Sequence, residues 1–148
     1  MLSLIKRSAL VNYSAAEMYE LVNDVGSYGK FLPWCRSSSV QSETETEMRA
    51  TVEIAKGVLN KSFTTQNRLT KNSRIDMELV NGPFRQLRGF WLFEPLKTEG
   101  ACRVNLELEF EFDNAMMSIA AKPIFTQIAN SLVDAFCKRA TEVYGERD

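Results

Sequence analysis

Histidine is absent from the 148 residues. Because histidine is the commonest general base and the commonest metal ligand among side chains, its absence excludes Ser-His and Cys-His nucleophilic sites. Neither a GxGxxG pattern nor a phosphate-binding GxxxxGK[ST] loop occurs. The sequence therefore predicts a protein without a catalytic residue set, without a metal site and without a required cofactor.

Cysteine is scarce as well. Cys35, Cys102 and Cys137 are far apart, odd in number and free of any CxxC spacing, so neither a disulfide framework nor a zinc site is expected. Reduced thiols are typical of the cytosol. Cys35 lies beside Trp34 and could be a reactive thiol, but burial as a small apolar residue is the favoured interpretation.

Long apolar runs are also missing. No stretch reaches the ~18 consecutive apolar residues of a membrane span, and "MLSLIKRSAL" lacks the apolar run of a secretory signal. We expect a cytoplasmic protein. Transient contact with a membrane surface, at the periphery of the inner membrane, stays open as an alternative.

Charge of one sign does not dominate, since the formal net charge is −1. Its distribution is uneven: residues 47–90 hold eight Lys or Arg against four Asp or Glu, and residues 91–115 hold two against six. Solvated strand faces are the simpler explanation. The other is a docking surface for RNA or anionic lipid, whereas nothing indicates DNA.

Two stretches near the amino terminus have clear local signals. Residues 2–11 are typical of a strand. Ser14 followed by Glu17 is a capping-box pattern, after which apolar residues recur at helical spacing and Gly26 is expected to end the helix. The proline in "SYGKFLPWC", residues 27–35, prevents a regular helix there.

The middle of the chain alternates apolar and polar residues with a period of two. Such alternation predicts an antiparallel sheet that is covered on one face and exposed to water on the other. The clearest case is "CRVNLELEFEF", and "QLRGFWLFE" is apolar on both faces. The predicted strands span residues 47–55, 61–69, 74–80, 86–94 and 102–112, with a weaker one near 37–42.

The carboxyl-terminal part predicts one long helix. Apolar residues form a continuous stripe from Ile124 to Tyr144, and Pro123 either starts this helix or kinks a longer one that begins near Ala115. Only the inner face of a curved sheet is large enough to cover that stripe. We therefore predict a single α+β domain over residues 1–148, in which the sheet wraps around the helix.

Large rings also occur in predicted connections, where packing explains them less readily. Phe31, Leu32 and Trp34 lie in the stretch after the first helix, and Phe84 follows the stiff Gly82-Pro83 pair. Connections that carry large apolar side chains often cover a cavity or a partner. These residues are predicted to form a lid.

Four blocks resemble a known family: "VNYSAAEMYELVNDVGSYGKFLPWC", "NGPFRQLRGFWLFEPL", "LELEFEF" and "IANSLVDAFCKRATEVYG". They are similar to the START-like polyketide cyclase/dehydrase family, in the branch with coenzyme Q-binding proteins and bacterial ribosome association toxins. The resemblance covers residues 11–145. It implies the helix-grip fold, β-α-α-β6-α, with a hydrophobic cavity between the sheet and the long helix.

The first functional hypothesis is a non-catalytic binding protein that supports respiration. Its ligand would be ubiquinone or a similar isoprenoid lipid, with Asn67, Gln66 or Arg85 as donors to a quinone carbonyl. A completely filled core without a ligand is the alternative. The predicted ligand-binding residues are Phe31, Leu32, Trp34, Phe63, Met77, Pro83, Phe84, Trp91, Phe93, Leu106, Leu108, Phe125, Ile128 and Leu132.

The second hypothesis is a ribosome-associated toxin that binds the large ribosomal subunit and inhibits the initiation of translation. Basic side chains would contact phosphates, with binding that weakens steeply as salt is raised. A third, weaker hypothesis is a polyketide cyclase-like enzyme. The predicted ribosome-binding residues are Lys61, Arg68, Lys71, Arg74, Arg85 and Arg88.

Overall fold

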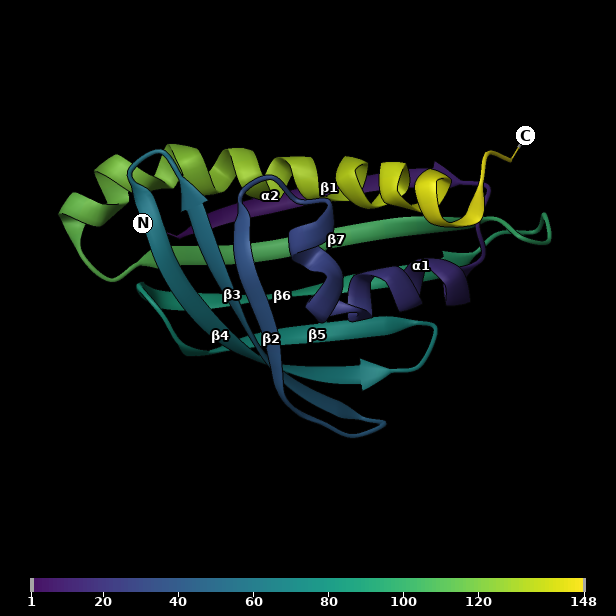
Figure 1. The fold of residues 1–148 in the computed structure, drawn as a ribbon, viewed down its shortest axis with the longest axis horizontal. Coiled ribbons are helices and arrows are strands. Elements are labelled where there is room, and N and C mark those ends of the chain that lie inside the picture. Colours follow the sequence, from purple (N-terminus) through teal and green to yellow (C-terminus); the bar gives the residue numbers. More distant parts are fainter. Residues whose placement is uncertain (1, 148) are drawn as a thin grey trace.

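A computed structural model describes residues 2–147 of the chain. Seven strands form one antiparallel sheet in the order β1-β7-β6-β5-β4-β3-β2, and the sheet curves around the long helix α2 (Ala115–Tyr144) (Figure 1). The predicted α+β helix-grip class is confirmed. The strands are β1 (Ser3–Val11), β2 (Cys35–Glu43), β3 (Glu47–Lys56), β4 (Leu59–Thr70), β5 (Arg74–Asn81), β6 (Phe84–Pro95) and β7 (Cys102–Phe112).

Helix α1 (Ala15–Asn23) begins with the predicted capping box. The Glu17 backbone N–H donates to the Ser14 hydroxyl at 3.1 Å, and the Ser14 N–H donates to the Glu17 carboxylate at 2.9 Å. The predicted end at Gly26 is wrong, because α1 ends at Asn23 and Gly26 lies in a following 3₁₀ helix, η1 (Val25–Lys30). The chain tightens there, as helix ends commonly do.

The alternation read from the sequence corresponds to the two faces of the sheet. In β7 every second residue from Cys102 to Phe112 is buried, and the residues between them are exposed or half-buried. The weakly predicted strand is β2, at one edge of the sheet. Its serines and two register shifts against β3 make this edge a poor template for pairing with another chain.

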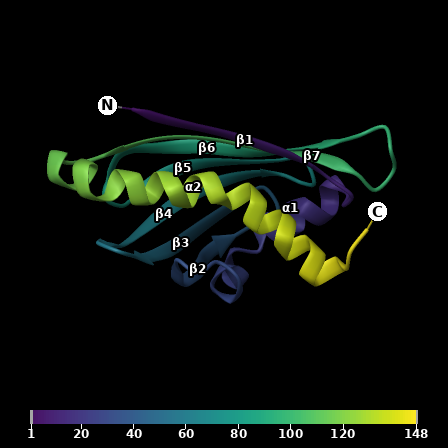
Figure 2. The ribbon, with the colours of Figure 1, turned by 90° about the horizontal axis from the view of Figure 1, so that it is seen from above.

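Helix α2 packs its apolar stripe onto the concave face of the sheet. The sequence left two roles open for Pro123, and the structure places it inside a 30-residue helix that begins at Ala115 with Asn114 as its cap. Figure 2 shows α2 crossing the sheet from one end to the other. The buried stripe consists of Ala121, Phe125, Ile128, Ala129, Val133, Phe136 and Ala140.

Gly89 allows close approach of two strands in the middle of β6. A Cβ atom at this position would collide with the carbonyl oxygen of Glu107 on β7 and would lie 2.9 Å from the Cα of Leu108. Both obstacles are backbone atoms, which cannot rotate away as a side chain can. The close approach of β6 to β7 at this position therefore requires glycine.

A clamp joins the end of α2 to the start of α1. The Arg147 guanidinium donates to both carboxylate oxygens of Glu17, at 2.7 and 2.9 Å, and the Tyr13 hydroxyl donates to the Gly145 carbonyl at 2.7 Å. The Arg147 hydrogen bonds, with further bonds from Ser14, hold the pKa of Glu17 at about 2, against an ordinary value of 4.5. The same carboxylate thus caps α1 and anchors the carboxyl-terminal segment.

Candidate functional site

A cavity of about 100 Å³ lies between the concave face of the sheet and α2. Its walls are almost wholly apolar and come from η1, from β3 to β7 and from α2, with Trp34 between η1 and β2. Nine of the predicted ligand-binding residues line it: Trp34, Phe63, Met77, Trp91, Leu106, Leu108, Phe125, Ile128 and Leu132. Four further lining residues agree with the prediction: Val52, Ile54 and Phe136 were expected on the apolar walls, and Asn67 was expected as a donor. The lining residues that the sequence did not predict are Val25, Tyr28, Ala50, Thr65, Leu87 and Ala129.

Two buried polar side chains of β4 give the cavity one hydrophilic wall. The Thr65 hydroxyl donates to the Asn67 side-chain oxygen at 2.9 Å. Within residues 2–147 the Asn67 amide nitrogen has no hydrogen-bond partner. Of the three donors suggested for a quinone carbonyl, Asn67 alone lines the cavity, because Gln66 faces the opposite side of β4 and Arg85 is exposed.

The size of the cavity limits what it can hold. Pockets for drug-sized ligands usually measure about 300–1,000 Å³. A cavity of about 100 Å³ has room for a few atoms of a ring or for a short aliphatic segment, but not for a quinone with an isoprenoid tail. Such a ligand would require α2 or the residues around Trp34 to move away from the sheet.

Leu32 and Phe84, two of the predicted lid residues, are buried in the core, and Phe31 packs against it, so these three do not lie above an opening. Phe84 is the first residue of β6, is 6% exposed and stacks on Phe112 with ring centroids 4.8 Å apart, so its assignment to a connection is wrong. Leu32 is 1% exposed. Phe31 packs edge-on against Phe136 and lies under a guanidinium of α2.

Pro83 and Phe93 also lie away from the cavity walls. Pro83 precedes β6, where its carbonyl accepts a hydrogen bond from Asp113. Phe93 is 1% exposed and contacts Tyr19 of α1, because β6 runs on past the cavity to the end of the sheet that α1 covers. Trp34 alone of the predicted lid lines the cavity and is half-buried.

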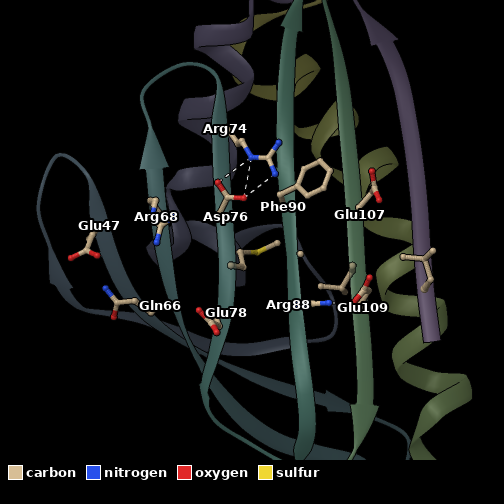
Figure 3. A pocket seen from close by; sticks show the side chains of 14 residues that line it. Glu47, Gln66, Arg68, Arg74, Asp76, Glu78, Arg88, Phe90, Glu107 and Glu109 are labelled. Carbon is tan, nitrogen blue, oxygen red and sulfur yellow. Dashed lines mark hydrogen bonds and ion pairs between the residues drawn. The ribbon is translucent and has the colours of Figure 1, made fainter. Parts of the chain in front are cut away.

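The outer face of the sheet carries a second, larger depression of about 620 Å³. We call it the outer groove; Figure 3 shows its charged side chains standing on β3 to β7. Arg74 donates twice to Asp76 at 3.0 Å and its guanidinium lies 4.0 Å from the centre of the Phe90 ring. The lining residues are Leu4, Glu47, Gln66, Arg68, Arg74, Asp76, Met77, Glu78, Arg88, Gly89, Phe90, Glu107, Leu108 and Glu109.

Neighbouring carboxylates neutralise two of the three arginines of the outer groove, Arg74 through Asp76 on the same strand and Arg88 across a strand pair. Arg88 on β6 forms an ion pair with Glu109 on β7 at 3.0 Å, because the acidic last strand lies directly beside β6. The groove holds three arginines and five carboxylates. A uniformly basic docking surface, the alternative to solvated strand faces, is therefore wrong for this face, which has mixed charge with an excess of acid.

The six predicted ribosome-binding residues do not form one patch. Arg68, Arg74 and Arg88 line the outer groove, and Lys71 lies in the turn after β4. Lys61 lies near the opposite end of β4, and Arg85 borders a separate depression beside the start of α2. In residues 2–147, Arg68 and Lys71 form no ion pair, which leaves them available to a partner.

The three thiols are poorly suited to nucleophilic chemistry. Burial is the largest cause of a raised pKa at Cys35, Cys102 and Cys137, and it brings that of Cys102 to about 11. Cys35 is buried, as favoured from the sequence, and its thiol donates weakly to the Ser37 carbonyl. In the described part of the chain no cluster of three or more Cys, Asp or Glu residues could hold a metal ion.

Comparison with known proteins places this geometry in a family. Residues 11–137 match the family described as polyketide cyclase / dehydrase and lipid transport. The chain belongs to this family. A crystal structure of another protein of the same fold, from Thermus thermophilus, superposes with a TM-score of 0.80 at 15% identity, over 95% of this chain and 98% of that one.

Relatives of the polyketide cyclase / dehydrase and lipid transport family carry different names. A ribosome association toxin from Vibrio cholerae is 49% identical over 142 residues, which is 96% of this chain and 98% of that protein. A mitochondrial coenzyme Q-binding protein from Drosophila melanogaster is 32% identical over 133 residues, covering 88% of this chain and 55% of that protein. The resemblance read from the sequence is thereby confirmed at the level of the family.

Proposed function

We propose that this chain associates with the ribosome as a non-catalytic inhibitor of translation that works in the cytoplasm. The observation that carries the proposal is its 49% identity, over nearly the full length of both chains, to a protein named as a ribosome association toxin. This choice reverses the order of the two leading hypotheses drawn from the sequence. The large ribosomal subunit remains the partner we propose.

The cavity supports this order. With about 100 Å³ of free space it offers little to an isoprenoid ligand in its present form. The absence of histidine and the raised pKa values of the thiols likewise favour a binding role over a cyclase reaction. The contact with the ribosome is therefore expected on the outer surface of the molecule.

The outer groove is the surface we propose for this contact. Arg68 and the adjoining Lys71 are free to meet RNA phosphates. The Arg74–Phe90 stack, whose guanidinium is paired with Asp76, offers a flat surface of the kind on which bases rest. The surrounding carboxylates repel phosphates and attract basic side chains. The groove would therefore fit only an RNA position that lies beside a basic ribosomal protein. Phosphate contacts of this kind weaken as salt is raised.

Cosedimentation of the purified protein with large subunits on sucrose gradients tests this proposal. Reversing two charges in Arg68→Glu/Lys71→Glu should weaken binding and lower the slope of its salt dependence by about 2. The matched control is Lys30→Glu/Lys138→Glu, which changes the net charge equally at exposed positions away from the groove. Equal binding by wild type and both variants would contradict the assigned surface, and no binding by the wild type would contradict the function.

Binding of an apolar ligand is the second candidate, favoured by one specific observation. The unpaired Asn67 amide points a donor into an apolar cavity, which suits a carbonyl of a ring such as a quinone. Native mass spectrometry of the protein from its host would detect such a ligand. Asn67→Leu should abolish its retention and exposed Asn81→Leu should not; protein that is persistently empty would count against this candidate.

A further inference from the structure

The outward face of α2 changes character at Pro123. Before this residue the face is apolar: Met116 is 82% exposed, Ile119 is 80% exposed, and Ala120 and Pro123 are exposed beside them. One turn later Gln127 continues the same face with a polar side chain. An exposed methionine and isoleucine contribute nothing to the core, so the fold does not explain their presence.

The hairpin between β3 and β4 extends this apolar surface. Val58, at its tip, is 69% exposed. Both views show the hairpin and the first turns of α2 at the same end of the molecule, and the hairpin rises to the level of the helix (Figures 1 and 2). The two elements touch, because a Cβ atom at Gly57 would lie 3.2 Å from the Ile124 side chain. We call Met116, Ile119, Ala120, Pro123 and Val58 the end patch.

Only positive charge lies within the segments that carry the end patch. Lys56 and Lys61 flank the hairpin tip, and Lys122 lies in α2. No Asp or Glu occurs in residues 54–75 or between Asn114 and Val133. In the described residues none of these three lysines forms an ion pair. The nearest acids in sequence are Glu53, before the hairpin, and Asp113, just before the helix cap. Glu111 and Arg85 together line the depression that Ile119 borders, so they add no net charge there.

We propose that the end patch docks this protein onto an anionic lipid surface. Exposed Met, Ile and Val side chains can enter the boundary between headgroups and acyl chains, while lysines beside them attract anionic headgroups. Charge complementarity selects lipid over an apolar groove of another protein, because such a groove would leave three lysines without partners. A contact made by a few exposed side chains and lysines would be shallow and reversible. No helix in residues 2–147 is long and apolar enough to cross a membrane.

Cosedimentation of the full chain with vesicles tests the proposal. The protein should pellet with phosphatidylcholine vesicles that contain phosphatidylglycerol and should stay in solution with phosphatidylcholine alone. Binding should fall as salt is raised, because the Debye length is only ~10 Å at 0.1 M. Met116→Gln/Ile119→Gln should weaken binding about tenfold or more, since two large apolar side chains no longer enter the lipid.

Val143→Gln is the matched control, because Val143 is an exposed apolar residue near the other end of α2, at 48% exposure. It should bind anionic vesicles as the wild type does. Circular dichroism should show that all variants are folded, since each replaced side chain is exposed. Failure of the wild type to bind anionic vesicles, or equal binding by the double variant, would overturn the proposal. The proposal would also be overturned if the wild type were a dimer and the double variant a monomer. The end patch would then be the contact between two copies of the chain.

Discussion

Filling the inner cavity is the sharpest test of whether it has a role. Ala50 lies on β3, is 3% exposed and faces the free space. At about 24 cal/mol per Å³, complete filling of 100 Å³ would stabilise the protein by roughly 2.4 kcal/mol. Ala50→Val fills part of that space with a side chain suited to a strand, so we expect the free energy of unfolding to rise by about 1 kcal/mol.

Urea unfolding followed by tryptophan fluorescence measures this change, because both tryptophans, Trp34 and Trp91, line the cavity. Ala55→Val is the control, since it places the same side chain on the same strand outside the cavity. A loss of more than about 1 kcal/mol for Ala50→Val would mean that the interior is already tightly packed and would refute the reasoning. Under the proposed function the filled variant still cosediments with ribosomes; a stable variant that does not would implicate the cavity in that activity.

Three further outcomes are expected. Arg147→Gln should lower the free energy of unfolding modestly at neutral pH, because water screens the pair when the Glu17 and Arg147 side chains are 25% and 39% exposed. Since folding lowers the pKa of Glu17 from 4.5 to about 2, this stabilisation exists above pH 4.5 and is lost as the pH falls towards 2, so urea titrations of the two proteins should converge in acid. Gly89→Ala should lower the melting temperature markedly in calorimetry, and a neutral effect would show that the strands can separate there. Phe84→Ala should destabilise by about 3–5 kcal/mol and half-buried Trp34→Ala by less; equal losses in denaturant would contradict their different burial.

The sequence predicted those features that depend on neighbours along the chain. Ser14 and Glu17 form their capping box because the partners are three residues apart, and β7 alternates because successive side chains of any strand point to opposite faces. The long apolar stripe of α2 required a curved sheet to cover it, which led to the correct fold class.

The features that were missed depend on which strands become neighbours and on how tightly side chains fit. A surplus of basic residues in one segment does not reveal that Arg88 will face Glu109 across a strand pair. Phe84 follows Gly82-Pro83 and therefore resembles a loop residue, yet four other phenylalanines surround it. The volume of the cavity is the small difference between a large enclosed space and the side chains within it, and only three-dimensional packing determines it.

Pro123 divides α2 into two parts that differ in stiffness. Because proline has no backbone N–H, the carbonyl of Ile119 receives no helical hydrogen bond from it, and the turn between them is held less firmly. The part beyond Pro123 is fastened along its whole length by buried side chains, from Phe125 to Ala140, whereas the part before it rests mainly on Ala121. Amide protons of the first two turns of α2 should therefore exchange with solvent by local opening. Their exchange should be much faster than that of the amide protons beyond Pro123.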